Sequence, residues 1–169
     1  MPAFDSDGIE IPSPREEDVE VVLEIGGQFD DCSFYLEFFH ESLDKEEISS
    51  ALGLAPSQAW NTGEPHPIGN GSSGHTRVDD YGKWALKVPV KTVSISDALQ
   101  EFLCSCSAST CVWRDLSLRW SGRIALVGRT RSWNREFSLS AEAVAAIADR
   151  GLKLNFDAYF CGDNANAEA

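Results

Sequence analysis

Residues 32–40 read Cys-Ser-Phe-Tyr-Leu-Glu-Phe-Phe-His (CSFYLEFFH). Aromatic side chains favour the pleated, half-buried surface of a β-sheet, so this segment predicts a strand. Residues 83–88 (KWALKV) predict a second strand, and residues 152–160 (LKLNFDAYF) alternate apolar and polar side chains as a further one. The chain therefore contains a β-sheet.

Other segments add to this sheet. Residues 19–25 (VEVVLEI) alternate, with apolar side chains on one face and Glu20 and Glu24 on the other, which predicts a half-buried strand with an acidic outer face. Residues 111–120 and 123–129 flank a Ser-Gly dipeptide, and this arrangement predicts two strands joined in a hairpin.

Helix start and stop signals occur between the strands. Asp44 can cap the free amides of a first helix while Glu47, three residues later, reaches back to complete a capping box. A second helix begins at residues 94–97 (SISD). A third follows residues 138–140 (SLS), and Gly151 ends it.

Strands occur both as neighbouring pairs and in alternation with helices. This order predicts an α+β fold, a mostly antiparallel sheet with about three helices packed on it. We expect a flexible acidic tail at 1–16, a single α+β domain at 17–161 and a frayed C-terminus at 162–169. Residues 61–82 are rich in Gly, Pro, Asn and Ser and predict a long loop.

The net charge of −13 is unevenly distributed along the 169 residues. Residues 1–75 hold 16 acids and two bases, a net −14, whereas residues 76–169 hold eleven acids and twelve bases, a net +1. Six arginines fall within residues 114–135. Such acidity argues against binding to nucleic acid or anionic lipid, and it favours steered capture of a basic partner. It is equally compatible with simple solubility.

No stretch reaches the roughly 18 apolar residues of a membrane span, and the first residues lack the basic and apolar regions of a signal peptide. The five cysteines are odd in number and unevenly spaced, which favours a reducing compartment over a disulfide framework. We therefore expect a cytoplasmic protein with no membrane partner.

The motifs together resemble a known family. They are the aromatic strand (FYLEFF), residues 43–48 (LDKEEI), residues 52–56 (LGLAP), Ala59-Trp60 with Gly63, Gly82-Lys83-Trp84, residues 138–140 (SLS) and residues 151–157 (GLKLNFD). This pattern is similar to domain of unknown function 4279, a bacterial family, over roughly residues 32–160. The strand at 19–25 and the Gly-rich insertion at 61–82 depart from it.

The resemblance implies an intracellular α+β domain without established catalytic residues. It also implies a possible place among the immunity proteins that accompany bacterial toxins, including those of contact-dependent growth inhibition. Combined with the charge, it predicts a non-enzymatic protein that binds and neutralises a cognate toxin, with an acidic face occluding a basic surface such as that of a nuclease.

Three groups of residues are candidates for function. The predicted partner-binding face consists of Glu20, Glu24, Asp30, Asp31, Glu37, Glu41, Glu46 and Glu47. A possible secondary surface, rich in the residue types of interface hot spots, consists of Trp113, Arg119, Trp120, Arg129 and Trp133. Alternatively, the arginines of this segment pair with the acids of residues 17–47 inside the fold. Trp60 and Trp84 flank the long loop and are predicted to anchor it.

The sequence supports no catalytic or metal-binding residues and no cofactor. His66 and His75 lie in the loop without a fixed metal-binding spacing, and loop histidines are usually solvated. Cys104, Cys106 and Cys111 lack paired CxxC spacing. The alternative function is a small-molecule-binding or regulatory domain, in which residues 61–82 form a lid over a pocket near Trp60 and Trp84. The oligomeric state is not predicted.

Overall fold

The structure, a computed structural model, describes residues 3–4, 10–11, 29–68, 74–90, 94–131 and 135–161. The predicted strand at 19–25, with Glu20 and Glu24, lies outside the described residues, as do Trp133 and the C-terminal segment 162–169. Within the predicted tail, β1 (Ala3–Phe4) and β2 (Glu10–Ile11) pair as a two-stranded antiparallel sheet.

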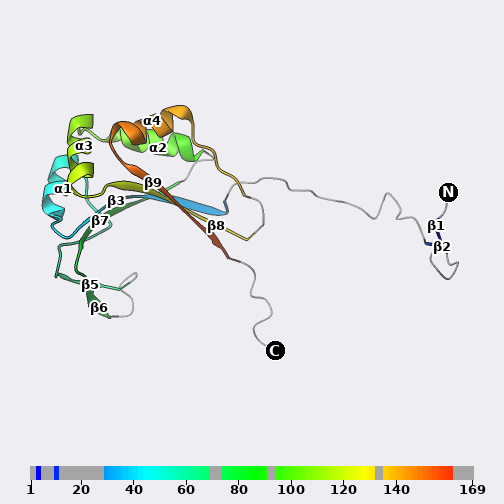
Figure 1. The fold of residues 1–169 in the computed structure, drawn as a ribbon, viewed down its shortest axis with the longest axis horizontal. Coiled ribbons are helices and arrows are strands. Elements are labelled where there is room, and N and C mark those ends of the chain that lie inside the picture. Colours follow the sequence, from blue (N-terminus) through cyan, green and yellow to red (C-terminus); the bar gives the residue numbers. More distant parts are fainter. Residues whose placement is uncertain are drawn as a thin grey trace.

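A five-stranded sheet forms the centre of the domain (Figure 1). Its order is β4 (Gln58–Trp60), β7 (Gly82–Pro89), β3 (Asp31–His40), β8 (Arg123–Thr130) and β9 (Lys153–Phe160). The aromatic segment is the central strand β3, and its neighbours β7 and β8 both run antiparallel to it. The sheet is therefore mainly antiparallel, as the sequence predicts.

The strand β9 is the exception, because it runs parallel to β8. Parallel neighbours need a crossover connection that returns the chain to the same end of the sheet. The helix α4 (Ala141–Asp149) provides this crossover between β8 and β9.

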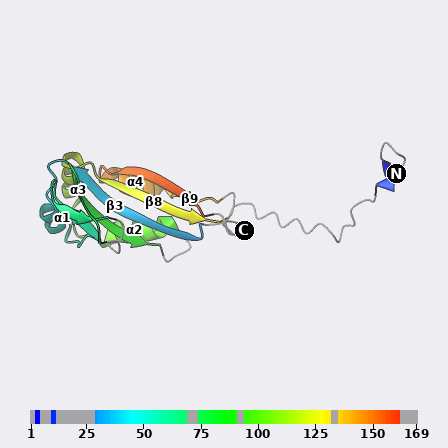
Figure 2. The ribbon, with the colours of Figure 1, turned by 90° about the horizontal axis from the view of Figure 1, so that it is seen from below.

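In the described part of the chain four helices, rather than about three, cover one face of the sheet (Figure 1). They are α1 (Lys45–Leu52), α2 (Ile95–Ser105), α3 (Thr110–Arg119) and α4. The core between helices and sheet includes Phe34, Leu36 and Phe38 of β3, which alternate with residues that face the opposite side. Figure 2 looks onto this opposite side, which no described helix covers and which we call the open face.

The prediction of a hairpin at residues 111–129 was wrong, because its first half is the helix α3. Trp113, Leu116, Ser117 and Trp120 are buried and recur at the three- and four-residue spacing of one helix face. Leu118, by contrast, is 86% exposed. The aromatic and apolar composition favours a strand locally, but the helical spacing of the buried positions prevails.

The predicted helix caps are present. Asp44 accepts hydrogen bonds from the amides of Glu46 and Glu47, although the side chain of Glu47 pairs with Arg119 instead of completing the capping box. Gly53 and Gly151 have φ values of 68° and 67° where α1 and α4 end, and only glycine adopts these values without strain.

The predicted loop at 61–82 contains a small antiparallel sheet of β5 (Pro65–Pro67) and β6 (Thr76–Val78). Residues 69–73, between these strands, lie outside the described residues. Within the part of the chain that is described, no helix is both long enough and apolar enough to cross a membrane.

Candidate functional site

The acidic residues predicted to form one partner-binding face lie in separate places. Asp30 and Asp31 lie at the start of β3, whereas Glu41, Glu46 and Glu47 follow its end. A ten-residue strand spans about 30 Å, so the two groups occupy opposite ends of the sheet. The six described acids therefore do not form a single patch.

Four of these acids pair with the arginine-rich segment. Arg131 lies 3.7 Å from Asp30, Arg129 lies 3.0 Å from Asp31, and Arg119 lies 2.7 Å from Glu47. Arg123 similarly pairs with Glu37 at 2.8 Å. The pairing of these arginines with these acids, which the sequence leaves open, is thus present in the fold. The paired carboxylates and guanidiniums neutralise each other, so both segments offer less charge to a partner.

Glu37 lies in the middle of the open face and is only 6% exposed. Its Oε2 accepts hydrogen bonds from Nε of Arg123 at 2.8 Å, and Nη2 of the same guanidinium lies 2.8 Å from it. Nζ of Lys83 lies 3.5 Å from Oε1. Because the carboxylate is enclosed between two cations, Glu37 holds the sheet face together and offers little charge to a partner.

The predicted secondary surface is divided between core and surface. Trp113 and Trp120 are buried in the core, so neither is available for a partner. The guanidinium of Arg119 lies 4.2 Å from the ring centre of Trp120 and also pairs with Asp115. The hydrogen bond that Arg119 donates to Glu47 is the main cause that raises the pKa of Arg119. Arg129 remains half exposed beside Asp31.

Trp60 and Trp84 do not share a pocket, because neighbouring positions of the sheet place them on opposite faces. Trp84 is fully buried on the helix side and donates from Nε1 to the Ser49 hydroxyl at 2.9 Å. The ring of Trp60 stacks on that of His66, with the ring centres 3.7 Å apart and an angle of 3° between the ring planes. His66 in turn lies 3.3 Å from Asp79, which also pairs with Arg77. These contacts fix the base of the β5–β6 hairpin.

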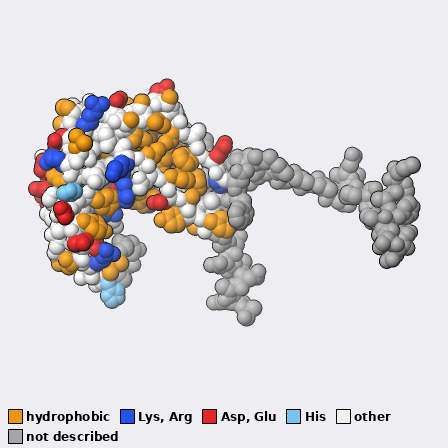
Figure 3. Space-filling view, viewed as in Figure 1, with side chains coloured by type: hydrophobic (Ala, Val, Ile, Leu, Met, Phe, Trp, Pro, Cys, Tyr) orange, Lys and Arg blue, Asp and Glu red, His pale blue; other side chains and the backbone are white. Residues whose placement is uncertain are grey.

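The strand β9 exposes an apolar edge of the sheet. No described strand lies beyond it, and all eight of its residues are exposed. The large apolar side chains on it are Leu154, Phe156, Tyr159 and Phe160, which are 43%, 45%, 53% and 57% exposed. Figure 3 shows hydrophobic side chains gathered over the region of α4 and β9. Exposed apolar surface of this kind on a sheet edge is typical of interaction sites.

No described strand pairs with the outer side of the β9 backbone. The amide of Lys153 donates to Gly122 and that of Cys161 donates to Thr130, at 3.0 and 2.8 Å. In a parallel ladder these bonds alternate along the strand, so the odd-numbered amides point to β8. The amides of Leu154, Phe156 and Ala158 consequently point away from the sheet.

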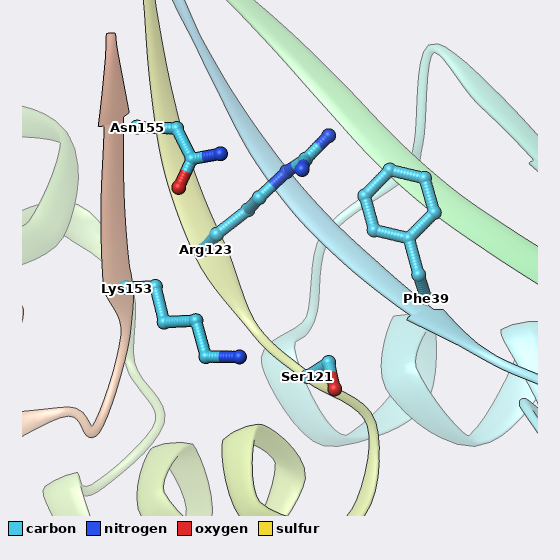
Figure 4. A pocket seen from close by; sticks show the side chains of 5 residues that line it. All are labelled: Phe39, Ser121, Arg123, Lys153 and Asn155. Carbon is cyan, nitrogen blue, oxygen red and sulfur yellow. The ribbon is translucent and has the colours of Figure 1, made fainter.

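A separate pocket of about 310 Å³ lies on the open face (Figure 4). Its lining side chains come from the end of β3, the turn before β8, the start of β8 and the start of β9; they are Phe39, Ser121, Arg123, Lys153 and Asn155. Sequence reasoning missed this pocket, because only the parallel register of β8 and β9 brings Arg123 and Lys153 together.

Within the described ranges, no three His, Cys, Asp or Glu residues are grouped so that they could hold a metal ion. All five cysteines are free thiols. Nδ1 of His40 hydrogen-bonds the Ser42 hydroxyl at 2.8 Å, in an exposed turn. His66 is confined to the hairpin base.

The fold and these surfaces define an α+β domain with four helices on one face of a sheet, a free apolar edge and an open face with a basic pocket. Over residues 30–161 the sequence matches the family described as Domain of unknown function (DUF4279), and the chain belongs to this family. No curated protein and no solved structure matches it.

Proposed function

We propose that this protein is a non-enzymatic, cytoplasmic immunity protein that binds and neutralises a cognate bacterial toxin. The observation that carries the proposal is the apolar edge of β9, beyond which no described strand lies. The toxin as partner comes from the family resemblance, which implies a place among the immunity proteins of contact-dependent growth inhibition and related systems.

The edge suits a partner that adds a strand. The outward amides of Leu154, Phe156 and Ala158 alternate with carbonyl groups, and an extended segment of the toxin hydrogen-bonds to them. The apolar side chains of β9 supply the area that such a segment buries. Binding along an edge gives affinity through the backbone, and the side chains give selectivity.

The remaining charge favours a basic toxin. Residues 1–28 hold eight acids and Arg15, a net −7, which is more than half of the total of −13. Glu41 and Glu46 are exposed and make no ion pair with any described residue. This charge raises the rate of association with a Lys- and Arg-rich surface, such as that of a nuclease, and the bound domain occludes that surface.

Co-expression with the product of the neighbouring reading frame tests the proposal. Ala158→Pro removes an outward amide and leaves the β8 ladder intact, since proline is tolerated on the free side of an edge strand. We expect it to abolish protection and co-purification, whereas Ala158→Val, which keeps the amide, retains both. A non-toxic neighbour, or equal protection by the two variants, contradicts the proposal.

A second candidate, a small-molecule-binding domain, is favoured by the pocket on the open face. That pocket is lined by neither Trp60 nor Trp84. The Trp60–His66 stack holds the base of the hairpin at 61–82, and Trp60 and Trp84 lie on opposite faces of the sheet, so the ligand site of this second candidate is the pocket on the open face.

A further inference from the structure

The pocket on the open face concentrates positive charge in an acidic protein. Arg123 and Lys153 stand directly opposite each other in the β8–β9 ladder. Like charges at such positions destabilise a sheet. Glu37, on the other side of Arg123, is the nearby carboxylate, and it already pairs with both Arg123 and Lys83. Two cations therefore share one carboxylate, and Lys153 is a third cation beside Arg123.

The ammonium of Lys153 adds uncompensated charge. Among the described residues, no carboxylate lies within ion-pair distance of it. Figure 4 shows the Lys153 side chain extending from β9 toward β8 and Ser121, with the Asn155 amide on the same side of the sheet. The hydroxyl of Ser121 and the amide of Asn155 add hydrogen-bond donors, and none of the described residues that line the pocket is a carboxylate.

The opposite wall of the pocket is apolar. It is the ring of Phe39, which carries the Arg123 guanidinium 4.5 Å from its centre. The volume of about 310 Å³ lies at the lower end of the range for small-molecule sites. A ligand that fits this pocket has an anionic end beside Arg123 and Lys153 and a small apolar body against Phe39.

We propose that this pocket binds a small organic phosphate. Two cations with two neutral donors match the charge and the several acceptor oxygens of a phosphate better than those of a single carboxylate. The acidity of the whole chain does not oppose this, because exposed charges beyond about 8 Å are screened at physiological salt. This site is independent of the toxin-binding proposal and of β9's outer edge.

Calorimetric titration of the full chain with phenyl phosphate tests the site. We expect saturable binding at one site per chain. Lys153→Gln should weaken it at least about tenfold, through loss of a charge-assisted hydrogen bond. Lys87→Gln is the matched control, since Lys87 lies on the same face, 5.9 Å from the Tyr35 ring centre, but does not line the pocket. It should bind like the parent.

Three results would overturn the proposal: no saturable binding of phenyl phosphate, equal affinities for Lys153→Gln and Lys87→Gln, or tighter binding of benzoate than of phenyl phosphate. Inorganic phosphate should bind more weakly than phenyl phosphate, and equal affinity would remove the role of Phe39. Asn155→Ala, checked for folding by its thermal transition, repeats the test if Lys153→Gln does not fold.

Discussion

Arg123 and Glu37 face each other across β8 and β3, and Nε of the guanidinium donates to Oε2 of the carboxylate at 2.8 Å. The same guanidinium packs over Phe39, 4.5 Å from the ring centre. The pair joins two regions that the sequence separates by 86 residues. It also fixes the position of Arg123 at the pocket.

We predict that Glu37→Gln destabilises the protein by about 1–3 kcal/mol. The substitution removes the charge that two cations share at a nearly buried site, and hydrogen bonds to charged groups contribute this much. Urea unfolding measures the change. Glu41→Gln, at an exposed turn, is the control and should change stability by less than about 0.5 kcal/mol. Equal effects of the two substitutions would contradict the structural role of Glu37.

The sequence was sufficient to predict the elements with strong local signals. The central strand, the three helices with serine or aspartate caps and the last strand all depend on short-range patterns. The helix α3 was missed because its aromatic composition favours a strand, and its buried stripe is evident only at helical spacing. The parallel pairing of β8 and β9 was missed because register is a long-range property.

Gly122 offers a test of the turn between α3 and β8. A Cβ at this position would lie 2.7 Å from the Ser117 hydroxyl and 2.8 Å from atoms of Leu152 and Phe38. Gly122→Ala should therefore destabilise the fold by about 1–3 kcal/mol through overpacking. Thermal or urea unfolding measures this.

The neighbouring Ser121 provides the matched control. Its φ of 38° is in the left-handed region, where glycine is unstrained. In Ser121→Gly, relief of strain offsets the greater freedom of the unfolded chain, so stability should stay within about 0.5 kcal/mol of the parent. A loss of stability as large as that of Gly122→Ala would mean that the backbone conformation of the turn, and not the packing around a Cβ at position 122, determines the destabilisation.

Glu64 predicts a dependence of stability on pH. Its carboxylate accepts hydrogen bonds from the Asn61 amide at 2.9 Å and from the Lys45 ammonium at 2.7 Å. The hydrogen bond from the backbone amide of Asn61 is the largest cause that lowers the pKa of Glu64 below its ordinary value of 4.5, and the hydrogen bond from the Lys45 ammonium is the next largest. A lowered pKa gives stability that is present above pH 4.5 and is lost as the pH falls through the folded pKa.

Glu64→Gln should accordingly be less stable than the parent at neutral pH, and the difference should vanish in acid. Urea midpoints across the pH range measure it. Lys45→Met should retain part of the dependence, because the Asn61 amide remains. A difference in stability between the parent and Glu64→Gln that grows as the pH falls would contradict a lowered pKa of Glu64 in the folded chain.

The cysteines should separate by reactivity. Burial is the main cause that raises the pKa of Cys106 and of Cys32, so less of each is thiolate near neutral pH. Cys104, Cys111 and Cys161 are exposed. Mass spectrometry after a short iodoacetamide pulse should find these three modified first. In urea, all five cysteines should be modified at similar rates. Labelling of Cys106 as fast as Cys104 in the folded chain would contradict its burial.

The candidate sites were less predictable than the fold. The acids of residues 30–47 and the arginines of 114–135 were recognised as charged segments, but the fold pairs four acids with four arginines across strands and helices. Trp113 and Trp120 were predicted as possible surface residues and are core. A sequence shows which side chains are present, whereas topology decides which of them reach the surface.

Amide hydrogen exchange along β9 tests the proposed function most directly. The measurement compares Leu154, Phe156 and Ala158 in the free chain and in the complex with the toxin. We predict fast exchange in the free chain and about hundredfold slower exchange in the complex, because the toxin segment hydrogen-bonds to these outward amides. Slow exchange already in the free chain would mean that another part of the chain occupies the edge. That result, or unchanged exchange in the complex, would contradict β9 as the binding edge.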